Sequence, residues 1–151
     1  MADPHPHAAP ARLRSLPSWL LTQSSLPAHR LVADRLAAVG ARGYHYRLLA
    51  TLTEFGPESQ ANLGRRTGIH LSDIVAAVNE LAEAGFVDRS PDPADRRRNV
   101  ITVTATGRTR LDELETVLGQ VQEELLAPLN DQEREQLVSL LAKVLDHHGR
   151  L

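Results

Sequence analysis

The sequence predicts a mainly helical fold with one small β-hairpin. Apolar residues recur at helical spacing along most of the chain, and glycine or proline ends most of these runs. One stretch, residues 86–104, changes instead to short β-branched runs around a polar loop. The 151 residues are enough for one domain with its own core.

Composition excludes several classes of protein. Hydrophobic residues make up 42%, and no apolar run approaches the ~18 residues of a membrane span, so no membrane partner is expected. The first ten residues lack the apolar stretch of a signal peptide, and we expect a disordered tail over residues 1–12. The chain has no cysteine, which excludes disulfides and thiolate metal sites. A cytoplasmic location fits these features.

Charge is unevenly distributed although the formal net charge is only −2. Residues 65–110 carry eight basic and six acidic side chains, whereas residues 112–151 carry three basic and nine acidic ones. The basic residues include the runs Arg65–Arg66 and Arg96–Arg98. Local positive charge suits contact with phosphate, although any one such run is also typical of a solvated loop.

The first helix is expected to begin after Ser15, acting as N-cap, and to end at Gly40. Pro27 should break or kink this helix, because proline removes a backbone donor and clashes with the preceding turn. A second helix is predicted over Arg42–Phe55, where a Gly-Pro pair follows.

Two short helices are predicted next, over Ser59–Thr67 and Leu71–Ala84, with Gly68 between them and Gly85 after them. Two helices joined by a tight glycine-containing turn form a helix-turn-helix.

The segment that follows predicts two strands, Phe86–Arg89 and Val100–Thr104, around the polar loop Ser90–Asn99. A hairpin directly after a helix-turn-helix is a wing. The loop is too long for a tight turn, so its tip should project into solvent.

The C-terminal part predicts two further helices, the first from Gly107 to about Ala127 and the second after Asn130, where Glu133 completes a capping box. The first of these carries a heptad-like stripe of Leu111, Leu114, Leu118, Val121 and Leu125. Such stripes usually pack within one subunit. Here the first and the last two helices lie outside the compact unit, so pairing with a second copy is the economical way to bury them.

The run from Asp92 to Gly107, DPADRRRNVITVTATG, resembles the wing signature of the MarR (multiple-antibiotic-resistance regulator) family, and Leu81–Arg89 resembles the exit from its recognition helix. The resemblance covers about residues 13–148. It implies a winged helix-turn-helix fold of six helices in a triangular homodimer. Residues 13–40 and 108–151 would then supply the dimerisation helices, and residues 41–107 the DNA-binding lobe.

The resemblance also implies a repressor that binds double-stranded DNA, with residue roles that follow from position. Arg97 matches the wing arginine that enters the minor groove, and Asp95 matches the carboxylate that braces it. For Arg96 and Arg98, phosphate contact or solvation is as good an interpretation as base reading. For Arg65 and Arg66, phosphate contact and solvation are equally good interpretations.

The predicted recognition helix departs from the family pattern, because it has no basic residue from His70 to Ala84. Its candidate base readers are therefore His70, Ser72, Asp73 and Ala76. Arginine on guanine is the commonest specific base contact, so readout is expected to depend more than usual on the wing.

A small-molecule effector, such as an aromatic or phenolic carboxylate, is a further implication of the family. The candidate contacts on the first two helices are Arg14, Trp19, Gln23, His45 and Tyr46. Arg14, near the sole tryptophan, is the preferred anion contact, with a solvent-exposed arginine or an intersubunit ion pair as the equal alternative.

No catalytic signature, cofactor site or metal site is predicted. His5, His7, His147 and His148 lie near the ends of the chain without the spacing of a structural metal site, although metal sensing is kept as an alternative. A constitutive DNA-binding regulator and a winged-helix module for protein interaction also stay open. The three arginines of the wing argue against the protein-interaction module.

Overall fold

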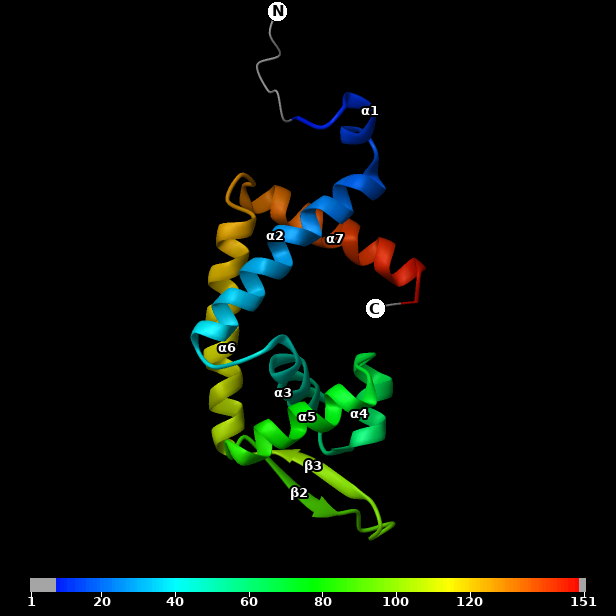
Figure 1. Ribbon diagram of the computed structural model, residues 1–151, viewed down its shortest axis with the longest axis vertical. Coiled ribbons are helices and arrows are strands. Elements are labelled where there is room, and N and C mark those ends of the chain that lie inside the picture. Colours follow the sequence, from blue (N-terminus) through cyan, green and yellow to red (C-terminus); the bar gives the residue numbers. More distant parts are fainter. Residues whose placement is uncertain (1–7, 150–151) are drawn as a thin grey trace, which may run out of the picture.

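The structure is a computed structural model that describes residues 8–149 (Figure 1). These residues form seven helices and one three-stranded antiparallel sheet. In chain order the elements are α1 (Ala11–Arg14), α2 (Pro17–Ala38), α3 (Gly43–Phe55), β1 (Glu58–Ser59), α4 (Gln60–Thr67), α5 (Leu71–Glu83), β2 (Val87–Pro91), β3 (Asn99–Val103), α6 (Ala105–Leu125) and α7 (Asp131–His147). No helix in this range is both long and apolar enough to cross a membrane.

The elements divide between a lobe and an arm (Figure 1). The lobe holds α3, α4, α5 and the sheet, with the β2–β3 hairpin projecting from it. The arm holds α2, which packs along α6, and α7, which crosses their far end. Helix α6 begins beside the sheet and continues into the arm, so it joins the two parts.

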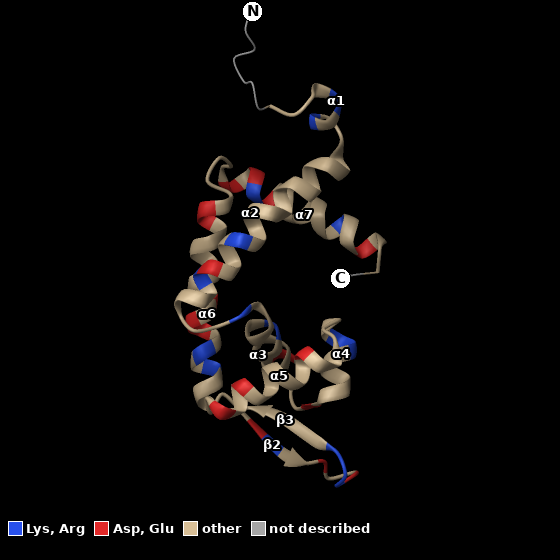
Figure 2. Cartoon of the chain, in the orientation of Figure 1, with Lys and Arg blue, Asp and Glu red and all other residues tan. Residues whose placement is uncertain are grey.

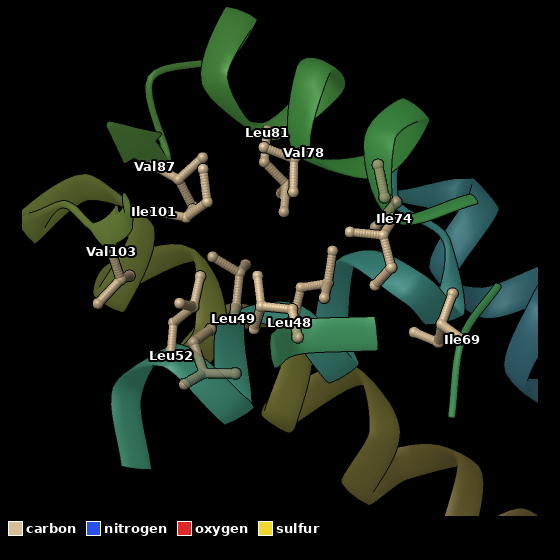
Figure 3. Packing of buried hydrophobic residues seen from close by; sticks show 14 of the residues in the cluster. Leu48, Leu49, Leu52, Ile69, Ile74, Val78, Leu81, Val87, Ile101 and Val103 are labelled. Carbon is tan, nitrogen blue, oxygen red and sulfur yellow. The ribbon is translucent and has the colours of Figure 1, made fainter. Parts of the chain in front are cut away.

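The core lies inside the lobe, between α3, α5 and the sheet (Figure 3). Helix α3 contributes Leu48 and Leu49, and α5 contributes Ile74 and Val78, all with no exposed surface. Ile101 of β3 closes the cluster from the side of the sheet, also fully buried. Burying one such side chain stabilises the fold by about 1.5–3 kcal/mol, so this cluster fixes α5 against the sheet.

The sheet has the order β1-β3-β2, with β3 in the centre. Strand β2 pairs with β3 from Val87↔Val103 to Pro91↔Asn99, which leaves residues 92–98 as the wing tip. Strand β1 was not predicted, because two residues show no alternating pattern. Ser59 pairs with Val100 and also caps α4 by accepting from Asn62 N–H, so α4 begins one residue later than expected.

The N-terminal helices differ from the prediction in two ways, and the structure excludes one of the two alternatives for Pro27. A single-turn helix, α1, precedes the expected first helix and includes residues placed in a disordered tail; residues 1–7 of that tail lie outside the described range. Ser15 is the C-cap of α1 rather than the N-cap of α2, which is Leu16. Helix α2 is not broken at Pro27. Proline has no N–H to donate to the carbonyl of Gln23, and Gln23 is exposed.

Candidate nucleic-acid interface

The wing tip is a closed turn held by its own backbone and by one carboxylate. Asp92 N–H donates to the carbonyl of Arg98 (2.8 Å), and Arg98 N–H donates to the carbonyl of Asp95 (2.9 Å). The Asp95 carboxylate accepts from Arg97 through both the backbone N–H and Nε, each at 3.1 Å. The side-chain bond from Arg97, followed by its backbone bond, lowers the pKa of Asp95, which therefore stays ionised near neutral pH.

Three arginines project from this turn. The side chain of Arg97 is 91% exposed even though its Nε is held by Asp95. Arg98 is 71% exposed, with Nε 3.8 Å from the same carboxylate, and Arg96 is exposed as well. The turn thus fixes the backbone and Nε of Arg97, while most of its side chain stays in solvent and is available to an anionic partner.

A basic groove lies between the wing and α4. It has a volume of about 440 Å³, and its lining includes Arg65, Arg97 and Arg98 but no carboxylate. Arg65 also donates to Asn62 on the same helix. Three cations without an acidic neighbour in the lining suit a phosphate group.

Arg66, the other predicted contact on α4, is engaged within the protein. Its Nη2 lies 3.4 Å from the carboxylate of Glu58, and its guanidinium lies 4.0 Å from the centre of the Phe55 ring. Both partners hold it against the lobe, so Arg66 points less freely outward than Arg65.

Helix α5 presents the predicted readers at its N-terminal end. Gly68, in a left-handed conformation (φ +68°), turns the chain from α4 into α5. His70 is the N-cap, and its Nδ1 accepts from Ser72 N–H at 3.5 Å. His70, Ser72 and Ala76 are exposed, whereas Asp73 is half-buried in the first turn, where a carboxylate favours the helix N-terminus.

The charges of the described residues follow this arrangement (Figure 2). Basic side chains gather at the wing tip and at the end of α4, while acidic side chains gather where α6 meets α7. Basic residues thus lie at both the end of α4 and the wing tip, where Asp92 and Asp95 also lie, and further basic residues occur on α1, α2, α6 and α7.

Sequence reasoning gave no role to an ion-pair network that joins α3 to α5. Glu80 of α5 accepts from Arg42 Nη2 (2.7 Å) and lies 2.5 Å from His45 Nε2. The Nδ1 atom of His45 accepts from Arg42 N–H (3.1 Å), so the neutral ring carries its proton on Nε2 and donates it to Glu80. The hydrogen bond from His45, and those from Arg42, lower the pKa of Glu80. No local pattern signals this contact, because its partners are 35 and 38 residues apart.

A cavity of about 260 Å³ lies beside this network, between α3, α5 and α6. Its polar lining includes His45, Glu80 and Arg110, and its apolar lining includes Phe86 and Leu114. The guanidinium of Arg110 lies 5.6 Å from the centre of the Phe86 ring and also bonds the carbonyl of Val39 and the carboxylate of Glu113. The cavity thus combines the Arg110 guanidinium, the His45 ring and the Glu80 carboxylate with an aromatic and aliphatic wall.

The predicted effector contacts do not all meet within one chain. His45 lines this cavity and Tyr46 is its neighbour on α3, where burial, and then the charge of Glu115, raises the pKa of the phenol. Arg14 lies on α1, with Trp19 and Gln23 on the first half of α2, at the end of the arm far from α3 (Figure 1).

No group of three or more metal-ligating side chains occurs in residues 8–149. His147 and His148 contact each other edge to face at the end of α7, with ring centres 4.9 Å apart. His5 and His7 lie outside the described residues.

Arg89 of β2 belongs to the segment that resembles the exit from the family's recognition helix, but sequence reasoning gave it no role. Its Nη2 donates to Oδ1 of Asn79 on α5. The alternation of β2 carries the signal for this contact, because Arg89 lies two residues after buried Val87 and so shares its face of the sheet.

Comparison with known proteins agrees with this geometry. A profile of the MarR family matches residues 39–98. The repressor NicR of Pseudomonas putida is 35% identical over 98 residues, which are 65% of this chain and 62% of NicR. The chain thus spans less than two thirds of this curated relative.

Solved structures match over more of the chain. A probable transcriptional regulator from Pseudomonas aeruginosa is 32% identical, covers 88% of this chain and is itself 99% covered, with a TM-score of 0.75. BpsR of Bordetella bronchiseptica, at 23% identity, has the same fold with a TM-score of 0.76 over 91% of this chain and 99% of its own. The winged lobe, the wing signature and these relatives together establish that the chain belongs to the MarR family of winged helix-turn-helix regulators.

Proposed function

We propose that the chain is a transcriptional repressor that binds duplex operator DNA as a homodimer and responds to a small aromatic carboxylate. The observation that carries the proposal is the braced, solvent-exposed Arg97 beside a basic groove. NicR, a relative by sequence, is named a repressor, and the DNA binding of BpsR is regulated by 6-hydroxynicotinic acid. MarR-family members are regulators rather than enzymes, so no catalytic residue is assigned.

On DNA, α5 and the wing contact different grooves. Helix α5 lies in the major groove, where Ser72 and Ala76 face the bases. Arg97 enters the adjacent minor groove, whose negative potential attracts a guanidinium where A·T pairs narrow it. The groove lined by Arg65 and Arg98 holds the phosphate between them. These contacts make affinity fall steeply with salt.

The dimer is supported by apolar surface that one chain leaves uncovered. On α7, Val138 and Leu140 are 63% and 62% exposed, and on α2, Leu20 and Leu26 are 45% and 56% exposed. Between α2, the end of α6 and α7 lies a hollow of about 600 Å³ lined mainly by leucine and other apolar side chains. A second copy of the arm buries these faces, because soluble monomeric proteins rarely expose large contiguous apolar patches.

The effector is supported by the cavity between α3, α5 and α6. Arg110 and His45 offer cationic or donor groups to a carboxylate, and Phe86 offers a ring to an aromatic acid. Glu80 lines the same cavity and belongs to α5, so an anion that competes for His45 also disturbs the helix that reads DNA. Arg14 and Trp19 remain candidates for contacts from the partner's copy of the arm.

A binding measurement with variants tests the DNA function. Fluorescence anisotropy with the DNA upstream of the encoding gene compares the wild type with Arg97→Ala and with Arg30→Ala, an exposed arginine on α2 without an ion pair in the described range. Arg97→Ala should weaken specific binding by at least about 30-fold, because the dimer loses two groove contacts of about 1–3 kcal/mol each. Arg30→Ala should bind like the wild type.

Equal losses in both variants, or unchanged binding by Arg97→Ala, would contradict the proposed role of the wing. Circular dichroism and sedimentation are the controls, since both variants should keep the fold and the oligomeric state.

The effector is tested separately with hydroxylated benzoates and pyridine carboxylates. An effective compound should release DNA, and one that binds beside Trp19 should also change the fluorescence of that residue. Arg110→Gln should lose this response if the cavity is the site, whereas Arg14→Gln should lose it if the anion binds beside Trp19. A release that neither variant alters contradicts both assignments.

A further inference from the structure

We propose that Arg89 supplies, from strand β2, the cation that helix α5 lacks, and that Arg89 and Asn79 together read a guanine in each half-site. The inference rests on the proposed DNA-binding function and adds a specificity determinant to it.

The strand geometry directs Arg89 at α5. Side chains alternate along a strand, so Arg89 shares a face of the sheet with Val87, which is 2% exposed and packs into the lobe core. Arg89 lies two residues after Val87, beyond the edge of the core, and its side chain is beside the exposed side of α5. There the guanidinium donates to Oδ1 of Asn79. The β2–β3 pairing at Arg89↔Ile101 fixes the backbone at this point.

Asn79 belongs to the DNA-facing side of α5. At 100° per residue, Ser72, Ala76 and Asn79 lie within about 60° of one another around the helix axis. All three are exposed, whereas Ile74 and Val78 point into the core. The Asn79–Arg89 pair therefore extends the stripe of predicted readers toward the C-terminal end of α5.

Arg89 has no carboxylate partner in the described residues, a property that it shares in the lobe with Arg47, Arg65 and Arg96. Arg42, Arg66 and Arg97 each lie within ion-pair distance of a carboxylate. In the described residues, no carboxylate lies within that distance of Arg89, whose side-chain partner is a neutral amide. The amide orients the guanidinium without neutralising it, which leaves both its charge and its other donors for DNA.

The chemistry of this pair fits guanine. An arginine held at one edge presents two parallel donors to O6 and N7 of guanine in the major groove. The Asn79 amide accepts from Arg89 and keeps its own NH₂ group to donate to a neighbouring acceptor. A phosphate contact by Arg89 is the competing role, and it needs positive charge but not the guanidinium fork.

The test selects binding sites from duplexes with a randomised central segment. Wild type, Arg89→Ala, Arg89→Lys, Asn79→Ala and the control Arg30→Ala are each carried through the selection. The wild type and Arg30→Ala should enrich the same two-fold symmetric motif. Arg89→Ala and Arg89→Lys should enrich that motif with the guanine preference lost at one position per half-site, and Asn79→Ala should weaken it there.

Direct binding to the selected site then measures the effect. Replacing that guanine should weaken the wild type roughly 5- to 150-fold per half-site and leave Arg89→Lys nearly unaffected. A motif that Arg89→Lys retains in full, with affinity and salt dependence like the wild type, makes Arg89 a phosphate contact and overturns the inference. If Arg89→Ala loses affinity equally for all sequences and also has a lowered melting temperature, Arg89 is a structural residue, and this result also overturns the inference. If the wild type enriches no motif at all, the proposed DNA-binding function itself fails.

Discussion

Gly107 stands where α6 begins beside the sheet, and replacing it by alanine should destabilise the protein. A Cβ at this position would lie 2.0 Å from the carbonyl oxygen of Phe86 and 2.9 Å from Cγ2 of Val103. The Phe86 oxygen is fixed, because it accepts from Thr104 N–H at 3.0 Å. Gly107 N–H in turn donates to Thr104 Oγ1, the N-cap of α6. The methyl group therefore meets backbone that cannot move without breaking this junction.

Two effects oppose each other in this substitution. Alanine is about 1 kcal/mol better than glycine inside a helix. Forcing a methyl group into a packed position costs about 1–3 kcal/mol, and losing the Phe86–Thr104 bond costs about 1 kcal/mol more. Because the contact is with backbone, we expect the steric cost to win by about 1–3 kcal/mol. At about 2–4 °C per kcal/mol, the melting temperature should fall by several degrees.

Gly119 provides the matched control, since it lies in the same helix and a Cβ there meets no atom within 4 Å. Gly119→Ala should stabilise the protein by up to about 1 kcal/mol through helix propensity alone. Urea unfolding at one protein concentration measures both changes, because the stability of the proposed dimer would depend on concentration. Equal or increased stability of Gly107→Ala would refute the steric reasoning. An increase in the stability of both variants would show that helix propensity decides both changes.

Three further substitutions probe the core, a cap and the ion-pair network. Leu48→Ala should destabilise the lobe by about 2–5 kcal/mol in urea unfolding, because Leu48 has no exposed surface, and a loss below about 1 kcal/mol would argue against the packing of α3. Asn130→Ala should cost about 1 kcal/mol in the same assay, since the Asn130 amide oxygen accepts from Glu133 N–H at 2.9 Å; Gln132→Ala, at the second residue of α7, should change little. The lowered pKa of Glu80 means that its contribution to stability is present above the ordinary glutamate pKa of about 4.3 and is lost as the pH falls through the lower folded value. Melting temperatures between about pH 3 and 6, a range set around that ordinary value, should therefore fall less steeply in Glu80→Gln than in the wild type, and parallel curves would contradict this role.

Local sequence signals predicted the helix ends of the lobe and the start of α7 in the arm. Gly68 and Gly85 both have positive φ and stand where the helices of the helix-turn-helix end, as expected from glycine's conformational freedom. Asn130 forms the predicted capping box with Glu133. Each of these signals acts within about four residues, so it can be read directly from the sequence.

The rest depended on contacts between distant residues. Strand β1 forms only because β3 supplies partners for its two residues. Pro27 does not end α2, which packs along α6, and such tertiary packing can override a local helix-breaking signal. The Glu80 network and the cavity beside Arg110 likewise join segments that no local pattern connects.

The wing tip has a consequence for how the chain meets proteases. Three consecutive arginines stand in an exposed turn, which is the setting that trypsin prefers for a first cut in a folded protein. Such a cut leaves two fragments that stay together through the β2–β3 pairing and the lobe core. A chain nicked there keeps its shape but loses the brace that Asp95 gives to Arg97. If the wing enters the minor groove as proposed, bound DNA covers the same peptide bonds, and the segment most open to digestion in the free protein becomes protected in the complex.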